Sequence, residues 1–216
     1  MPPNSKEINI IFHLLEQSHK PTMLEQLAHY TPFQLLIATL LSARTKDATV
    51  ISIVKELFKE YPHPQDFIDI DQKELEKKIY RIGFYRAKAK NIKILSQILL
   101  TQYQSKVPNT LEELTSLPGV GRKTANCILS YVYHKPAIAV DIHVHRIANR
   151  TGWVKTIKPE QTEKELQKLI PKTSWNNINR LFVSHGQTIC SPINPKCHLC
   201  PIITYCAYGK KKTTKN

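Results

Sequence analysis

The 216-residue sequence has few cysteines, few acidic residues and no long apolar segment, and each shortage excludes a class of protein. Five cysteines are too few and too unevenly placed for a disulfide framework. No apolar run approaches the roughly 20 residues of a membrane span, and the first residues lack the pattern of a signal peptide. With 41% hydrophobic and 22% charged residues, a soluble, cytoplasmic globular protein with a real core is expected.

The shortage of acidic residues leaves a strongly basic chain. There are 17 Asp and Glu against 31 Lys and Arg, which gives a formal net charge of +14. Such an excess favours a polyanionic partner, because binding releases counterions and the field steers association. An acidic lipid surface and a merely basic proteome are the alternatives, but no helix with a strongly cationic face supports the lipid. Nucleic acid is therefore a candidate partner, which charge alone does not establish.

No segment has a convincing strand pattern, whereas helical periodicity runs through nearly the whole chain, so the predicted fold class is all-α. Thr31 and Pro32 are expected to cap and open a helix that ends at Ser42. Asp47 is expected to cap the next helix, which Pro62 and Pro64 end. A first helical region is expected around Leu14, Leu15, Leu24 and Leu27. Further helices are predicted at about 72–81, 86–103, 110–116, 122–133, 142–150, 160–169 and 175–187, before a frayed, lysine-rich tail at 209–216.

A weak internal repeat aligns residues 82–89 with residues 118–125, and both copies are predicted to be helix, tight turn, helix. The second copy has Gly119 and Gly121 on either side of Val120, and their amides with the next helix start could form a nest for an anion. Val120 is expected to anchor the turn in the core. The first copy has Tyr85 in place of the second glycine, so only the second copy can bring bare backbone close to a ligand.

This glycine turn matches the helix-hairpin-helix motif, which grips the DNA backbone without reading its sequence. A duplex phosphate is the natural anion for so basic a chain. The alternative is a tight helical corner that binds nothing.

Four of the five cysteines have the spacing Cys-x6-Cys-x2-Cys-x5-Cys, from Cys190 through Cys197 and Cys200 to Cys206. A clustered set made only of cysteines in a cytoplasmic chain is typical of a metal site. Four thiolates can bind either zinc or an iron–sulfur cluster, and the spacing alone leaves both open. Disulfides are disfavoured by the compartment. Whichever group binds, it is expected to fold this segment.

Three stretches together resemble the endonuclease III family: residues 117–126, residues 139–146 and the four-cysteine spacing. The similarity extends from Ser42–Asp47 to Cys206. The resemblance implies a helix-hairpin-helix glycosylase fold and a 4Fe-4S cluster on the four cysteines. It also implies a six-helix barrel domain at 25–135 and a second helical domain, made of 1–24 and 136–216, that carries the cluster.

The resemblance also implies an activity. The family consists of bifunctional enzymes that remove oxidised, ring-saturated or fragmented pyrimidines from double-stranded DNA and then cut the abasic site. Its catalytic lysine falls on Lys123 and its catalytic aspartate on Asp141. The protein is then expected to be a monomer that works on DNA, with no membrane, in the cytoplasm of a prokaryote and associated with its nucleoid.

The residues themselves support these roles to different degrees. Lys123 taken alone is one surface lysine among many, but its place just after the glycine turn could make it face a flipped-out nucleotide. Asp141 could act as a base, cap the helix from Ile142, or do both. Arg44 and Phe84 could fill the gap left by a flipped base, whereas a phosphate contact and core packing are their ordinary alternatives. The predicted DNA-binding residues are Gly119, Val120, Gly121, Arg122, Thr124, Arg44 and Phe84.

The sequence departs from the family at a few positions. Arg44 stands where glutamine is often found, Phe84 replaces a smaller apolar residue, and Ile142 replaces a frequent threonine. The loop 191–196 keeps Lys196 as its main charge. Adenine glycosylases and mismatch-specific thymine glycosylases are rival assignments that usually lack a lysine at position 123. A non-catalytic DNA-binding or redox iron–sulfur protein is the third.

Overall fold

A computed structural model describes residues 2–213 of the chain, and within that range it is built from helices and connecting turns without a strand. The predicted all-α class is confirmed. Clustering of the backbone divides the chain into two compact units, 23–134 and 1–22 with 135–216. None of the helices among the described residues has the length and apolar character needed to cross a membrane.

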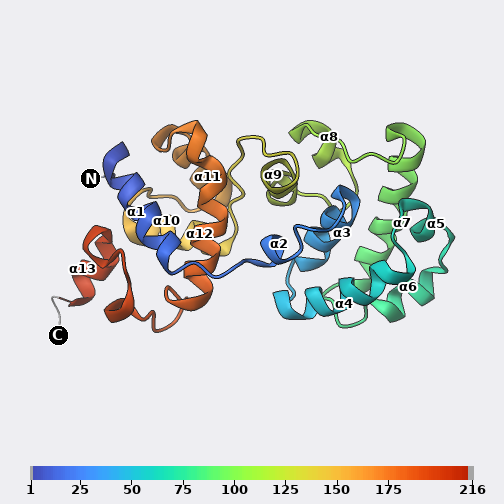
Figure 1. The fold of residues 1–216 in the computed structure, drawn as a ribbon, viewed down its shortest axis with the longest axis horizontal. Helices are drawn as coiled ribbons and strands as arrows, with labels where there is room; N and C mark the ends of the chain where they lie inside the picture. Colours follow the sequence, from blue (N-terminus) through green and yellow to red (C-terminus); the bar gives the residue numbers. More distant parts are fainter. Residues whose placement is uncertain (1, 214–216) are drawn as a thin grey trace. The chain divides into compact units, whose positions relative to one another are not determined.

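The unit formed by residues 23–134 is organised around α3, Pro32–Ser42 (Figure 1). Every residue of α3 from Phe33 to Leu41 is buried, and the helix packs against α4, α7 and α9. All of these residues except Gln34 and Thr39 are apolar, and a helix that is apolar on nearly every side belongs at the centre of a domain, which is where these contacts place it. The helices of this unit are α2 (Met23–Gln26), α3, α4 (Asp47–Glu60), α5 (Pro64–Asp69), α6 (Gln72–Lys78), α7 (Tyr85–Tyr103), α8 (Leu111–Ser116) and α9 (Arg122–Tyr131).

The start of α3 has the predicted cap. The Thr31 hydroxyl accepts from the Gln34 amide and the Gln34 side chain accepts from the Thr31 amide, which forms a capping box ahead of Pro32. The predicted cap at Asp47 is wrong, because α4 begins at Asp47 itself and its N-cap is Lys46, which makes no side-chain cap bond. Asp47 instead places its carboxylate in the first turn, where the helix dipole favours an anion.

The other unit surrounds an aromatic and aliphatic core. The ring of Trp153 lies between Phe12 and Phe182, with ring centroids 6.0 and 5.3 Å away. Ile8, Ile11 and other apolar residues of the first helix pack into the same core. The helices of this unit are α1 (Ser5–Gln17), α10 (Ile142–Thr151), α11 (Pro159–Leu169), α12 (Trp175–Thr188) and α13 (Ala207–Thr213), with short 3-10 turns at Lys172–Ser174, Cys197–Leu199 and Ile203–Tyr205.

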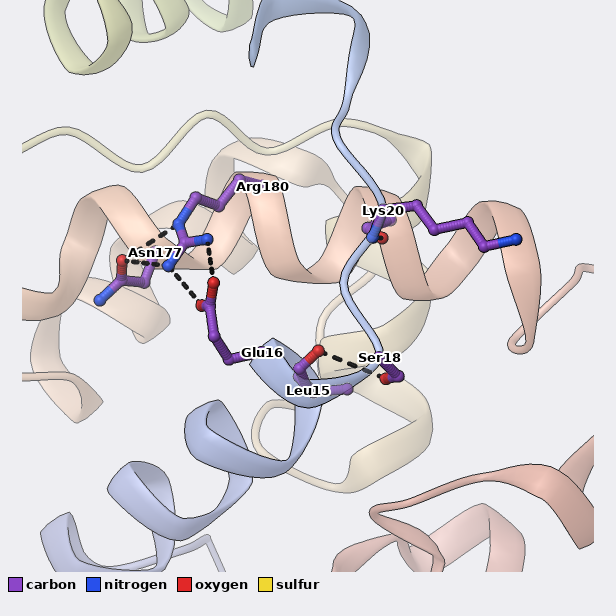
Figure 2. Close-up of polar contacts among 7 residues, drawn as sticks. Leu15, Glu16, Ser18, Lys20, Asn177 and Arg180 are labelled. Atoms are coloured by element: carbon purple, nitrogen blue, oxygen red, sulfur yellow. Dashed lines mark hydrogen bonds and ion pairs between the residues drawn. The ribbon is translucent and has the colours of Figure 1, made fainter. Parts of the chain in front are cut away.

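The N-terminal segment is bound to α12 by polar contacts as well as by this core (Figure 2). The Arg180 guanidinium donates to Glu16 Oε1 at 2.9 Å and to Glu16 Oε2 at 2.5 Å, and this pairing lowers the pKa of the Glu16 carboxyl. Beyond the helix, the Lys20 amide donates to Ser184 Oγ at 2.8 Å. These contacts join the start of the chain to a helix more than 160 residues later.

Several predicted boundaries differ from the structure. The first helical region is two helices, α1 and α2, and Leu27 follows the second. Helix α5 was not predicted, although Pro64 opens it in the position where proline suits a helix. The tail was predicted to be frayed from Gly209, but α13 continues to Thr213; residues 214–216 lie outside the described residues.

Candidate functional site

The two glycine positions of the second turn differ in their backbone conformation and in the space around them. Gly119 has φ +80°, a conformation that favours glycine, and a Cβ added there would lie 2.9 Å from Asn91 Nδ2, so the space is also tight. Gly121 has an ordinary φ of −86°, and a Cβ there would meet nothing within 4 Å. Val120 between them is only 4% exposed. Val120 therefore anchors the turn in the core, and the space beside Gly121 is open.

Helix α9 starts directly at this open position. Gly121 is its N-cap and supplies no side-chain cap, so the positive end of the helix follows a bare residue. Arg122 is exposed and Lys123 is partly exposed, whereas Thr124 is 9% exposed. The side chain of Thr124 is thus turned away from the surface that Arg122 occupies.

Arg44, in the turn between α3 and α4, lies next to Phe84, which directly precedes α7 in the same unit. The Arg44 guanidinium carbon is 5.4 Å from the centroid of the Phe84 ring. Phe84 is 65% exposed, so the ordinary alternative of core packing is wrong for this ring. Both residues have left-handed backbone, with φ 56° and 59°, which is uncommon for side chains of this size.

Asp141 caps α10, as one of its two sequence alternatives predicted. Its Oδ1 atom accepts from the amides of His143 and Val144 at 2.9 and 2.8 Å. The carboxylate is partly exposed, and Ile142 beside it is 72% exposed. Asp141 belongs to the unit of residues 1–22 and 135–216, whereas Lys123 belongs to the unit of residues 23–134.

The four clustered cysteines all line one cavity in the unit of residues 1–22 and 135–216. Three of the sulfurs have a nitrogen neighbour. The Gly209 amide donates to Cys206 Sγ at 3.3 Å, Arg150 Nη1 donates to Cys190 Sγ at 3.4 Å, and Cys200 Sγ lies 3.6 Å from His185 Nε2.

Burial affects the protonation of two of these thiols, Cys200 and Cys206. It raises the pKa of Cys200 to about 11 and also raises the pKa of Cys206. A bound positive charge would favour the thiolate form of these two residues.

The neighbours of the cysteines could not be found from the sequence. Arg150 donates from the end of α10 to the carbonyls of Ser191 and Pro192, both at 2.7 Å, and so binds the loop between the first two cysteines. His185 is 5% exposed on α12, and burial lowers its pKa to about 4. Neither residue stands out in the sequence, because an arginine and a histidine on predicted helices are ordinary surface residues.

Comparison with known proteins identifies the class of protein that this fold represents. A family model described as HhH-GPD superfamily base excision DNA repair protein matches residues 37–172. Endonuclease III of Thermotoga maritima is 46% identical over 181 residues, which is 84% of this chain and 85% of that protein. The chain belongs to this superfamily of base excision DNA repair proteins, and within it to the endonuclease III family.

Solved structures agree with this assignment. A non-covalent endonuclease III–DNA complex has a TM-score of 0.88 at 38% identity and covers 97% of this chain and 98% of its own. A trapped endonuclease III–DNA covalent intermediate has a TM-score of 0.86 at 38% identity over 96% of this chain and 98% of its own. The predicted helix-hairpin-helix glycosylase fold is confirmed, and the protein is a base excision repair DNA glycosylase and abasic-site lyase.

Proposed function

We propose that this enzyme removes oxidised, ring-saturated or fragmented pyrimidines from double-stranded DNA through Lys123, assisted by Asp141. The observation that carries the proposal is the place of Lys123, two residues after the open Gly121 and in the first turn of α9. A lysine there follows directly on the backbone that would hold a phosphate. It would therefore face a nucleotide rotated out of the duplex at that phosphate.

Lys123 would act as the nucleophile. Its neutral amine attacks C1′ of the damaged nucleotide, the bond to the base breaks, and the base leaves with the bonding electrons. The attached nitrogen loses a proton, and the sugar ring opens as the C1′–O4′ bond breaks and O4′ takes up a proton, which leaves a protonated imine between C1′ and Lys123. This imine loses a proton from C2′, and the C3′–O bond breaks so that the 3′ phosphate leaves with the bonding electrons. A lysine with the ordinary pKa of about 10.4 costs roughly 4–5 kcal/mol to neutralise at pH 7. The positive end of α9 reduces this cost, because it disfavours a cation in the first turn.

Asp141 would serve as the base and would stabilise positive charge on the sugar. Its helix-cap bonds to His143 and Val144 use Oδ1 and hold the carboxylate in one orientation. Capping and catalysis are compatible, because a carboxylate has a second oxygen and further lone pairs.

The glycine turn would hold the DNA backbone. Gly119, Gly121 and the start of α9 would offer amides and a helix N-terminus to one phosphate, and Arg122 adds an exposed positive charge. Val120 would contribute by anchoring the turn, since its amide already donates to the Leu117 carbonyl at 3.1 Å. Thr124 would contribute through its main chain, since its side chain is buried. Arg44 and Phe84 would enter the gap left by the flipped nucleotide, where unstacking costs a few kcal/mol.

The four cysteines would hold a 4Fe-4S cluster, as the endonuclease III family generally does. Around a single zinc ion with Zn–S distances near 2.3 Å, sulfurs lie roughly 4 Å apart. Within residues 2–213, no group of three or more His, Cys, Asp or Glu is arranged to hold one metal ion, yet all four thiols line one cavity. This arrangement favours a cluster, in which each iron takes one thiolate.

The cluster would stabilise the C-terminal segment and would take no part in the proposed chemical steps. Purified protein should contain about four irons per chain and show the brown colour of a thiolate-bound cluster. Stoichiometric zinc without iron, in protein produced with ample iron, would contradict this assignment.

The proposed setting is a monomer bound to the nucleoid in the cytoplasm of a prokaryote. It is supported by bacterial relatives of similar length and by the +14 charge. Binding to duplex DNA should weaken steeply as salt rises, because phosphate contacts release counterions.

Borohydride trapping on DNA with a single abasic site tests the proposed chemistry. Reduction of the imine should link the protein to DNA, and peptide mapping should place the link on Lys123. A related glycosylase without a lysine nucleophile would excise a base and leave no covalent product. Trapping on another residue, or none, would contradict the role of Lys123.

A further inference from the structure

Lys88 is a buried lysine that binds the end of one helix from another. Its side chain is 7% exposed on α7, and Nζ donates to the Leu41 carbonyl at 2.9 Å and to the Ala43 carbonyl at 2.6 Å. These two carbonyls belong to the end of α3, where carbonyls lack partners within the helix and the dipole is negative. Burying an ammonium is costly, and these contacts offset part of that cost. Burial lowers the pKa of Lys88 to about 8.

Lys88 also contacts the turn at Phe84, through its backbone amide. The Lys88 amide donates to the Phe84 carbonyl at 3.1 Å as the first helical bond of α7. Its Nζ binds the carbonyl of Ala43, the residue immediately before Arg44. Lys88 therefore contacts both left-handed turns, the Arg44 turn with its side chain and the Phe84 turn with its backbone.

The two turns also touch each other directly. The Gly83 amide donates to Thr45 Oγ1 at 3.0 Å, and a Cβ added at Gly83 would lie 2.7 Å from the Arg44 carbonyl oxygen. The Arg44 guanidinium stacks on the Phe84 ring. Left-handed conformations of large residues cost of order 1–3 kcal/mol each and persist only where their surroundings hold them. The contacts described here are the ones that hold them.

We propose that Lys88 is a positioning residue that ties the Arg44 turn to the Phe84 turn, so that both side chains meet DNA as one preformed element. The tie itself is a property of the free protein. Only its consequence for DNA rests on the proposed function, in which Arg44 and Phe84 enter the gap beside a flipped nucleotide. Preformed side chains lose less conformational freedom on binding, and so more of the contact energy is available to drive the base out.

The chain provides a matched control on the same helix. Lys93 also lies on α7, and its Nζ donates to the Ile68 carbonyl at 2.8 Å and to the Ile70 carbonyl at the end of α5. Lys93→Met removes an ammonium that binds two main-chain carbonyls, as Lys88→Met does, but it leaves both turns untouched. A general loss of stability would appear in both variants, whereas loss of the tie would appear only in Lys88→Met.

Hydrogen exchange of the free protein tests the tie without any assay of activity. The Thr45 amide, bonded to Ser42, and the Gly83 amide should exchange at least about tenfold faster in Lys88→Met and remain unchanged in Lys93→Met. Lys88→Gln keeps an uncharged NH2 donor group on a shorter side chain and should give an intermediate rate; it replaces Lys88→Met if that variant does not fold. Equal protection of both amides in wild type and in the Lys88 variants would overturn the proposal, as would equal loss in Lys93→Met.

Activity then tests the consequence for DNA. Lys88→Met should lower excision of a damaged base from duplex DNA about tenfold, with a much smaller effect on strand cleavage at a preformed abasic site, where no base must be flipped. Equal losses in both assays would overturn the positioning role. If the wild-type protein excised no base, the proposed function would fail, while hydrogen exchange would still decide whether Lys88 ties the turns.

Discussion

The two copies of the repeated helix-turn-helix segment share a sequence pattern but expose different parts of the turn. In the second copy the left-handed residue is Gly119, the apolar residue Val120 is buried, and the next position is the open Gly121. In the first copy the left-handed residue is Phe84, which aligns with Val120 and is 65% exposed. One turn therefore presents backbone and the other presents a large side chain.

The lysines of the two copies differ by one position in the alignment. Ala87 of the first copy aligns with Lys123 of the second, and the buried Lys88 aligns with the buried Thr124. A shift of one residue along a helix moves a side chain to another face. The first copy has a buried lysine that binds two main-chain carbonyls, and the second has a partly exposed lysine, for which we propose a catalytic role. Repetition of a motif in the sequence thus does not imply repetition of its function.

The largest expected effect comes from removing Lys123, the partly exposed lysine that the first copy lacks at the aligned position. Lys123→Gln should lower base excision on the order of 10⁴-fold or more and abolish borohydride trapping, because a carboxamide is not a nucleophile. Excision is measured in single turnover with an oxidised pyrimidine in a duplex. Lys90→Gln, at an exposed lysine of α7, should excise at the wild-type rate. Near wild-type excision and trapping by Lys123→Gln would place the nucleophile elsewhere.

The second effect tests whether the glycine turn and its lysine suffice without a group from the other unit. Asp141→Asn keeps an oxygen that can cap α10 but loses the charge and the base, so excision should fall about 10²- to 10⁴-fold. Binding to DNA should persist or tighten, since a negative charge near phosphate is removed. Thermal unfolding should change little and serves as the control. Unchanged excision with a normal melting temperature would remove Asp141 from the chemistry.

The third effect tests the bare backbone of the second turn. Gly121→Val places a side chain in the open space before the turn, and it should weaken binding to all duplex sequences alike, by about tenfold or 1.4 kcal/mol. Stability should stay near wild type, because φ at Gly121 is ordinary and no atom lies within 4 Å of the new Cβ. Gly119→Val is the contrasting variant, since it should fail mainly in folding. A sequence-selective loss of binding by Gly121→Val would contradict a grip on phosphate.

A smaller effect tests the exposed ring and guanidinium of the first turn. Arg44→Ala and Phe84→Ala should each lower excision about three- to tenfold and alter the preference for the opposite base, because the gap beside the flipped nucleotide stays unfilled. Cleavage of a preformed abasic site in single-stranded DNA provides the control. If both variants keep wild-type excision and opposite-base preference, the first turn has no role as a wedge.

The last effect is on stability rather than on DNA, and it concerns the internal lysine of the first copy. Burial lowers the folded-state pKa of Lys88 to about 8, below its value in the unfolded chain. The cost of the buried charge is present below about pH 8, and stability should rise as pH increases from there toward the ordinary lysine pKa, by about 3 kcal/mol at most. Urea unfolding at two pH values in this range measures the rise. It should be missing in Lys88→Met, and an equal rise in both proteins would refute the assignment to Lys88.

Local patterns in the sequence predicted most of the helices and two of the caps, those at Thr31 and Asp141. The capping box at Thr31 and the helix through Lys123 follow from short-range signals, and both are present. The cap at Asp47 was wrong because the boundary between cap and first turn moves by one residue without changing composition. The extension of α13 to Thr213 was missed, because a run of polar lysines has no apolar periodicity.

By itself the sequence determined the all-α class, the glycine turn, the cysteine set and membership of the endonuclease III family, since these depend on spacing and residue type along the chain. Only the tertiary structure decided that Phe84 is exposed and stacked on Arg44, that Lys88 binds the end of α3, and that Arg150 and His185 adjoin the cysteines. These contacts join residues 15 to 47 positions apart. No periodicity links such residues, because their proximity arises only when the helices pack.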